Sequence, residues 1–197
     1  MTFQPANDTI NKTDQEEYGM NRKIEVFDYA KEIVSAIPKG VLLTTKNGDT
    51  VNTMTIGWGT LGVEWGVPIF ITFVREGRFT RELLDASGEF TVNVPYGAFD
   101  RKILGYCGTK SGRNSNKISE LGLTLAASEV VKAPGIKELP LTLECKVLYR
   151  QLQDRNAIPE EIRRSMYPED ADSSCPGANR DYHVAYYGQI VNAYIIE

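Results

Sequence analysis

The chain has 197 residues, with 22 Lys and Arg against 26 Asp and Glu and a formal net charge of −4. This size suits one compact domain, and the negative balance argues against a nucleic-acid-binding surface, which needs a basic excess. No apolar run approaches the roughly 20 residues of a membrane helix, and the N-terminal stretch has no hydrophobic signal-peptide core. We therefore expect a cytoplasmic protein that binds neither nucleic acid nor membrane.

The N-terminal residues 1–22 are polar and follow no hydrophobic period. We expect them to form a flexible arm, either simply disordered or wrapped around a partner subunit, and residues 23–197 to form a single domain. The next segment has apolar residues at helical spacing and stops at Pro38, so it predicts a helix. Its apolar positions are Val26, Tyr29, Ala30, Ile33 and Ile37.

Strand signals recur through the rest of the chain. Residues 40–58 predict two strands joined at Asn47-Gly48, a strong hairpin signal. Pro68 opens the next strand, 68–74, where a missing N–H does least harm. Four more strands are expected in segments 89–95, 123–131, 139–153 and 182–197. Alternation within 139–153 places Cys145 on the apolar face, which predicts a core position for this thiol.

Short helices are expected between these strands. The first spans about Thr80 to Ser87, with Thr80 as its N-cap and Gly88 as its C-terminal stop. Others are expected within 98–107, within 115–122 and near the start of 158–181. Regular βαβ alternation and a G-x-G-x-x-G fingerprint are both missing. The pattern therefore predicts a mainly β architecture, closed or sandwiched, that is decorated with short helices.

Cysteine and histidine usage disfavours a metal site. The three cysteines, Cys107, Cys145 and Cys175, are odd in number and far apart, and His183 is the single histidine. A disulfide framework or a zinc site would need paired or clustered ligands.

One face of a predicted strand carries almost no large side chains. In the stretch "VNTMTIGWGTLG", residues 51–62, side chains alternate between two faces. Asn52, Met54, Ile56 and Trp58 share a face that can pack into a core, whereas the opposite face carries only Val51, threonines and glycines. Such a face lets a flat ligand or another backbone approach closely.

Two polar segments could hold an anion. Arg75, Arg78 and Arg81 are spaced by three around Thr80 at a predicted helix start, a place that suits phosphate. The alternative is a solvated basic face whose arginines pair with neighbouring glutamates. The loop "GTKSGRNSNK", residues 108–117, adds Lys110, Ser111 and Lys117 but lacks the P-loop order.

His183 lies within a predicted strand and has two interpretations. It is either a satisfied structural residue or a catalytic one. A G-x-S-x-G elbow and a second histidine are both missing, so hydrolase chemistry has little support. The small strand face and the cationic segments together outline a ligand with a flat part and an anionic tail, and FMN fits that outline.

The order of five motifs resembles a known family. The chain carries "NTMTIGWG", "VREGRFTREL", "GEFTVNVP", "GTKSGRNSNK" and "DYHVAYYGQI" in that order. In this order they resemble the flavin reductase-like proteins with an FMN-binding split barrel, most closely the flavoredoxin branch, over about residues 35–197. The resemblance implies an antiparallel split β-barrel with Greek-key connections and short decorating helices. It further implies a homodimer with FMN bound near the subunit interface.

The resemblance also implies roles for individual residues. Asn52, Thr53, Met54, Thr55 and Trp58 would border the flavin ring, while Arg75, Arg78 and Thr80 would hold the phosphate or ribityl chain. Lys110, Ser111 and Lys117 would complete the anion site. His183 would lie near the reactive face of the flavin as a catalytic residue. The 166–181 loop with Cys175 has no counterpart in the family pattern.

The implied activity is that of a flavin reductase-like NAD(P)H oxidoreductase. NADH or NADPH would act as a transient co-substrate, and electrons would pass through FMN to an acceptor such as a redox partner protein. One alternative is a non-enzymatic FMN-containing electron carrier without its own NAD(P)H activity. Another is a split-barrel module for a different cofactor such as haem.

Overall fold

The computed structural model describes residues 21–169 and 180–197 of the chain. Within these residues an eight-stranded antiparallel sheet has the order β3-β2-β6-β9-β10-β5-β4, and β1 pairs with β10 beside this path. Its strands are β1 (Arg22–Lys23), β2 (Val41–Asn47), β3 (Thr50–Ile56), β4 (Gly59–Glu64), β5 (Val67–Arg75), β6 (Glu89–Val94), β9 (Leu141–Leu152) and β10 (His183–Ile195). Since β3 and β4 lie at the two ends of this order, the sheet is a split barrel, as predicted.

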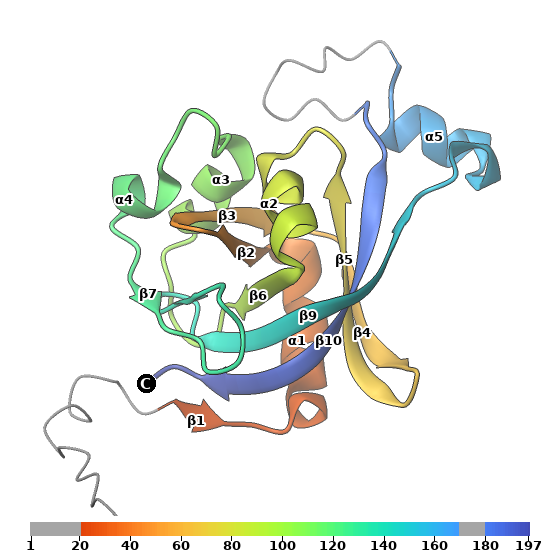
Figure 1. The fold of residues 1–197 in the computed structure, drawn as a ribbon. Helices are drawn as coiled ribbons and strands as arrows, with labels where there is room; N and C mark the ends of the chain where they lie inside the picture. Colours follow the sequence, from red (N-terminus) through yellow and green to blue (C-terminus); the bar gives the residue numbers. More distant parts are fainter. Residues whose placement is uncertain (1–20, 170–179) are drawn as a thin grey trace, which may run out of the picture.

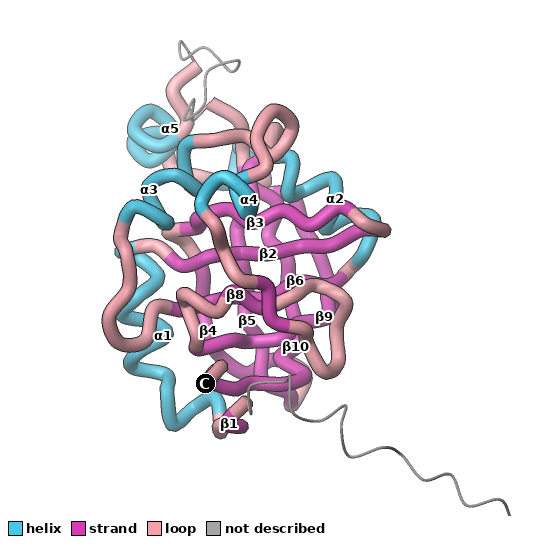
Figure 2. Tube along the Cα trace, turned by 90° about the vertical axis from the view of Figure 1, so that its left-hand side faces the viewer, coloured by secondary structure: helices cyan, strands magenta, loops and turns pink. Residues whose placement is uncertain are grey.

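Short helices cover the barrel, as Figures 1 and 2 show. In Figure 2, α1 runs along one side of the strands, whereas α3 and α4 lie beside β3. The helices are α1 (Ala30–Ala36), α2 (Phe79–Ser87), α3 (Lys102–Thr109), α4 (Lys117–Leu121) and α5 (Glu160–Met166). Short 3-10 helices at Val26–Tyr29 and Ile37–Lys39 flank α1, another lies at Arg155–Ala157, and β7 (Leu125–Ala126) pairs with β8 (Gly135–Ile136).

Glycine residues lie in a hairpin turn and at the ends of two helices, at the positions that the sequence predicts. The β2–β3 hairpin pairs Asn47 with Thr50 across the turn, and Gly48 has a positive φ of 56°. Helix α2 stops at Gly88 and α4 at Gly122, both in the left-handed conformation. Glycine adopts this conformation without the steric penalty of a Cβ atom. The hairpin and both helix ends are therefore confirmed.

Three details of the sequence prediction are wrong. The N-cap of α2 is Arg78, not Thr80, whose hydroxyl instead accepts a hydrogen bond from Asn52. Segment 123–131 contains only the two-residue strand β7, because its backbone turns away to be bound by the carboxylate of Glu144. The extended stretch from Val51 to Gly62 divides between β3 and β4, so the alternation does not continue through Trp58.

The strands in the middle of the sheet are buried on both faces. Leu43, Val92, Leu143 and Cys145 belong to the main core inside the barrel, which confirms the predicted core position of Cys145. On the other face of β2, Leu42 packs with residues of α3 and β8 in a second cluster. This second cluster attaches α3 to the sheet and thereby positions the helix beside β3.

Glu144 holds the loop that follows β7 by its buried carboxylate. The two oxygens accept hydrogen bonds from the backbone amides of Glu129, Val130 and Val131 at 2.7–3.0 Å, and from the side chain of Asn192 at 3.2 Å. Hydrogen bonds to a charged acceptor are stronger than neutral ones. Glu144 therefore fixes the backbone of residues 129–131 in this loop.

We expect Glu144→Gln to lower the free energy of unfolding by about 2–3 kcal/mol, because an amide nitrogen would face backbone donors in a buried place. Urea denaturation measures this loss. The matched control is Glu25→Gln, at an exposed position, which should change stability by less than about 0.5 kcal/mol. Equal stability of the two variants would contradict the assignment.

Some sequence expectations lie outside the described residues. They include the arm as far as residue 20 and Cys175 in the 166–181 loop. At the end of the arm, Arg22 lies in β1 and pairs with Ile195 of β10. The proposed division at residue 22 stays a prediction. No helix among the described residues has the length and apolar character needed to cross a bilayer.

Candidate functional site

Two hollows follow one another along β3. The first, named here the aromatic hollow, has a volume of about 230 Å³. The second, named the loop hollow, has a volume of about 420 Å³. The aromatic hollow is lined by residues 54–58 with Phe73, Arg75, Arg78 and His183, and the loop hollow by residues 49–53 with Phe79 and residues 112–118. The volume of the loop hollow lies within the range of about 300–1,000 Å³ found for small-molecule sites, and that of the aromatic hollow lies below it.

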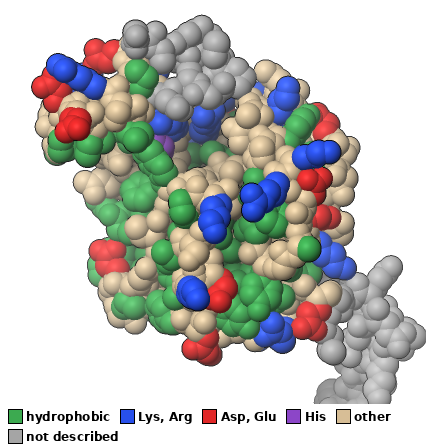
Figure 3. Space-filling model, turned by 180° about the vertical axis from the view of Figure 1, so that it is seen from behind, with side chains coloured by type: hydrophobic (Ala, Val, Ile, Leu, Met, Phe, Trp, Pro, Cys, Tyr) green, Lys and Arg blue, Asp and Glu red, His purple; other side chains and the backbone are tan. Residues whose placement is uncertain are grey.

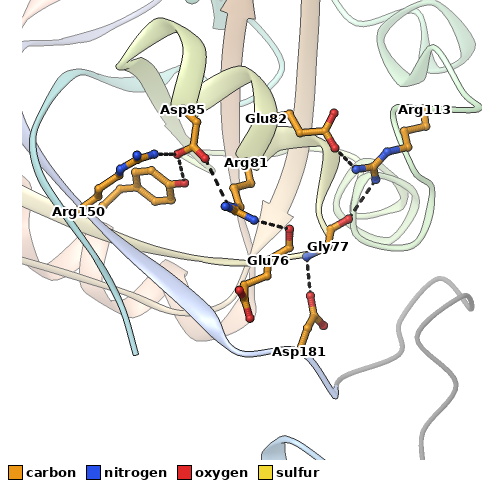
Figure 4. Close-up of polar contacts among 9 residues, drawn as sticks. Glu76, Gly77, Arg81, Glu82, Asp85, Arg113, Arg150 and Asp181 are labelled. Carbon is orange, nitrogen blue, oxygen red and sulfur yellow. Dashed lines mark hydrogen bonds and ion pairs between the residues drawn. The ribbon is translucent and has the colours of Figure 1, made fainter. Parts of the chain in front are cut away.

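The turn between β5 and α2 separates the two hollows and is fixed from several sides (Figure 4). The amide of Gly77 donates to Oδ2 of Asp181 at 2.7 Å, and its carbonyl accepts from Nη1 of Arg113 at 3.0 Å. Arg81 donates to the carbonyl of Glu76 at 3.2 Å. These contacts come from three different parts of the chain, so the turn holds one conformation.

The turn presents Arg78 and the N-terminus of α2 together. Arg78 is the N-cap residue, and its side chain makes no capping hydrogen bond. The first amides of a helix have no intrahelical partner and carry a partial positive charge. Within the described residues no acceptor pairs with the guanidinium of Arg78. Cation and helix end therefore form a region able to bind an anion.

Two further cations lie close to Arg78. Burial lowers the pKa of Lys117, and the positive charge of Arg78 lowers it further, although Cys107 opposes this. The pKa of Arg75 is also lowered, first by burial and then by Arg78, against the opposing effect of Asp181. Figure 3 shows the molecule from behind; there the purple histidine side chain lies beside blue side chains of Lys and Arg, in a hollow of the surface. Arg78 thus repels both Arg75 and Lys117, and an anion bound beside Arg78 would relieve that repulsion.

Arg75 is a structural as well as an electrostatic residue. It is buried at the end of β5, where its guanidinium donates to the backbone carbonyls of Asp181 at 2.6 Å and Met166 at 3.2 Å. Its guanidinium carbon also lies over the rings of Tyr167 and Trp58, at 5.1 and 5.9 Å from their centroids. Arg75 therefore joins the end of β5 to Met166 and Tyr167 after α5 and to Asp181 before β10.

His183 begins β10 and forms the wall of the aromatic hollow with Trp58. The two ring centroids are 4.6 Å apart, and Nδ1 of His183 lies 3.0 Å from the hydroxyl of Tyr167. Burial lowers the pKa of His183 to about 3, and Arg75 and Arg78 add to this effect, against the opposing effect of Asp181. The imidazole is consequently neutral at physiological pH.

The small-residue face of β3 is covered in part by protein. Thr53 is fully buried, and its hydroxyl is paired with that of Thr44 at 3.0 Å. Thr55 donates to the carbonyl of Leu104 in α3 at 2.7 Å, so this helix lies against the face at that position. On the other face, Nδ2 of Asn52 donates to Oγ1 of Thr80 at 2.7 Å. Thr80 is buried, so its side chain positions β3 and α2 relative to each other.

The loop after α3 closes the loop hollow over β3. A Cβ atom at Gly112 would lie 2.2 Å from Oδ1 of Asn52, so only glycine permits this approach. Nζ of Lys117 donates to the carbonyl of Lys110 at 3.2 Å, and Ser111 accepts from the amide of Arg113. Lys110 is exposed, and neither it nor Ser111 lines either of the two hollows.

A family model described as flavin reductase like domain matches residues 34–197. The chain belongs to this family. An uncharacterised protein of Archaeoglobus fulgidus is 33% identical over 111 residues, 56% of this chain and 62% of that relative, so the match spans less than two thirds of its length.

Solved structures of family members have the same fold. Flavoredoxin from Methanosarcina acetivorans is 26% identical with a TM-score of 0.57, over 80% of this chain and 68% of that one. The FMN-binding domain of a flavin reductases-like enzyme from Shewanella baltica is 17% identical with a TM-score of 0.62, over 91% and 78% of the two chains. The predicted family and its split barrel are therefore confirmed.

The structure adds two residues that the sequence did not indicate, since Phe79 lines the loop hollow and Tyr167 contacts His183. It also gives specific contacts to two residues of the 108–117 loop, because Gly112 lines the loop hollow and Arg113 joins the loop to the β5–α2 turn. The sequence contained a signal for Gly112, because a glycine within a polar loop marks a possible close approach of the backbone to another group. It contained no signal for Tyr167, because the segment between α5 and β10 has no hydrophobic period that would predict packing against the barrel.

The buried, neutral histidine makes stability depend on pH. Because the pKa is about 3 in the folded protein and 6.5 as the reference, only the unfolded state takes up a proton between these values. Stability should therefore fall as the pH falls below about 6.5, by about 2 kcal/mol between pH 7 and pH 5. Urea denaturation across this range measures the slope.

The matched variant for this prediction is His183→Gln, which has no group that titrates in this range. Its stability should stay nearly flat between pH 7 and pH 5, because His183 is the single histidine of the chain. If the wild-type protein were as flat as the variant, the imidazole would not be buried in its neutral form.

Proposed function

We propose that the chain is an FMN-binding oxidoreductase that moves electrons from NADH or NADPH through FMN to an acceptor. The proposal rests on one observation, the position of Arg78 at the N-terminus of α2, where no side chain caps the helix and Arg75 lines the same hollow. The charge of Arg78 also acts on Lys117. FMN has a dianionic phosphate at one end and a planar ring at the other. Membership of the flavin reductase-like family supports the same cofactor.

The cationic side of the site fits the phosphate. Arg78 and Lys117 would hold it together with the first amides of α2, an arrangement in which both charge and hydrogen-bond donors favour an anion. Gly112 keeps the loop close to Asn52 and so narrows the space beside these groups. In this arrangement Thr80 acts on the phosphate only through the position of α2, because its hydroxyl is engaged with Asn52.

The aromatic hollow fits the ring. When bound, FMN supplies the hydride chemistry, accepting two electrons from a reduced nicotinamide and passing them onward. Met54, Thr55 and Trp58 would border the ring and exclude water from one of its faces. His183 would contact the ligand at the far end of this hollow, and its neutral form avoids adding a further positive charge beside Arg75.

We also propose that the chain forms a homodimer, with the flavin near the subunit interface. An aromatic group on the β4–β5 turn, β9 and β10 supports a contact with a second copy. Trp65 is 58% exposed, and its ring lies 6.4 Å from Tyr149 and 6.2 Å from Tyr187. Large exposed apolar groups of this kind commonly mark interfaces.

We expect Arg78→Ala to weaken FMN binding about 10- to 100-fold, because one charge-assisted contact to the phosphate is worth about 1.5–3 kcal/mol. Riboflavin lacks the phosphate, so its affinity should change less than about threefold. Titration of each flavin against the purified chain, followed by flavin fluorescence, measures both constants.

The control for this variant is Arg164→Ala on α5, where the arginine pairs with Glu160 and lines neither hollow. It should bind both flavins as the wild type does. Equal losses of FMN and riboflavin in Arg78→Ala would count against the phosphate assignment. A wild-type chain that takes up no FMN would overturn the proposed function.

One of the similar proteins is described as a flavoredoxin, which supports a second candidate, an FMN electron carrier without its own NAD(P)H activity. Anaerobic stopped-flow mixing of the FMN-loaded chain with NADH or NADPH separates the two functions. We expect the absorption band of oxidised flavin to bleach with one of the nucleotides. Indifference to both would favour the carrier.

A further inference from the structure

Three side chains from separate segments form a chain of hydrogen bonds behind the aromatic hollow. Gln153 follows β9, Tyr167 follows α5, and His183 opens β10. The hydroxyl of Tyr167 lies 2.8 Å from Oε1 of Gln153 and 3.0 Å from Nδ1 of His183. The backbone holds Gln153 in place, since its amide donates to the carbonyl of His183 at 3.0 Å.

The direction of the hydrogen bonds follows from one group that can only donate. The backbone amide of His183 points at the side chain of Gln153, with a distance of 3.4 Å to Oε1. The facing atom of Gln153 must therefore be its oxygen, because an NH₂ group there would place donor against donor. Tyr167 has one hydroxyl hydrogen, and this oxygen accepts it.

The tautomer of His183 follows in turn. Since the hydrogen of Tyr167 is directed to Gln153, its oxygen can only accept from Nδ1, which must then carry the imidazole proton. Nε2 is left with a lone pair, and within the described residues it has no hydrogen-bond partner. The ring lines the aromatic hollow.

We propose that Gln153 and Tyr167 are positioning residues that hold His183 as the Nδ1–H tautomer, so that Nε2 offers the ligand a hydrogen-bond acceptor. The ligand group that it takes is an N–H or O–H donor. A carbonyl or phosphate oxygen at this point would meet lone pair against lone pair.

The side chains around Nε2 further restrict which ligand group can bind there. Arg78 lines the same hollow, and its guanidinium can only donate. An acceptor beside donors is complementary to an amide-type edge, in which a carbonyl adjoins an N–H. On the proposed function, which this step assumes, that edge is the imide of the flavin ring or the carboxamide of the nicotinamide.

The tautomer is measurable directly, because His183 is the single histidine of the chain. The full chain, produced without a histidine tag and labelled with ¹⁵N-histidine, gives one imidazole in a long-range ¹H–¹⁵N NMR spectrum. We expect the Nδ1–H pattern between pH 5 and pH 8. An Nε2–H pattern of the neutral ring would overturn the proposal.

Variants of Gln153 test the positioning role. Gln153→Leu removes the acceptor for Tyr167, whose hydrogen can then turn to Nδ1, so the Nε2–H form should become the major one. Gln153→Glu keeps an acceptor and should retain the wild-type tautomer. A merely structural role would leave the tautomer unchanged in both variants and so contradict the proposal.

A second pair of variants keeps the test independent of Gln153. Tyr167→Phe removes the partner of Nδ1, and both tautomers should then be populated. The matched control is Tyr96→Phe at an exposed position after β6, outside the hydrogen-bond chain, which should leave the spectrum unchanged. A wild-type spectrum in Tyr167→Phe would exclude the hydroxyl as the determinant.

Unlabelled ligands added to the labelled chain identify the donor. A shift of the Nε2 resonance with oxidised FMN alone assigns the flavin imide, and a shift only after NAD⁺ is added assigns the carboxamide. If FMN binds by fluorescence but neither addition shifts Nε2, the ligand assignment fails while the proposed function stands. If FMN does not bind, the proposed function fails, and the free-protein spectra still decide the positioning role.

Discussion

The positive charge of Arg78, at the N-terminus of α2 and beside Arg75 and Lys117, is the constraint around which the site is organised. Burial lowers the pKa of both Arg75 and Lys117, and the charge of Arg78 lowers each of them further. Folding them together has a free-energy cost, since like charges in a partly buried place repel. Such a cost is common where a binding site is preorganised for a charge that the protein does not itself supply.

The barrel provides the stability that offsets this cost. Its central strands are buried on both faces, and the carboxylate of Glu144 satisfies three backbone donors of an adjoining loop. Hydrogen bonds then attach the site firmly to the sheet. Asp181 and Arg113 bind the two sides of Gly77, so the turn that presents Arg78 cannot relax away from the other cations.

The histidine lies beside the cations and yet adds no charge. Burial and the neighbouring guanidinium groups keep His183 neutral, and its hydrogen bond to Tyr167 turns one nitrogen away from the aromatic hollow. The site therefore has two different ends, cationic donors at the α2 N-terminus and an aromatic wall with one neutral acceptor. A ligand with a phosphate at one end and a planar amide-bearing ring at the other matches both.

Local sequence patterns determine the elements of this protein. The Asn47-Gly48 hairpin, the glycine stops of α2 and α4 and the buried position of Cys145 all follow from alternation, turn chemistry and capping, which act over a few residues. The spacing of Arg75 and Arg78 about a helix start likewise predicts an anion site. The ordered motifs identify the family.

Only the tertiary structure decides which of these groups meet. Thr80 bonds to Asn52 and does not cap its helix, and Thr55 faces α3, because contacts between distant segments override the local preference. Lys117 joins the arginines across some forty residues of chain, and Tyr167 reaches His183 from a segment without any period. The sequence determined which donor side chains are present and how they are spaced locally. Packing decided which of them lie together, because side-chain partners across a barrel are set by strand order rather than by neighbours in the chain.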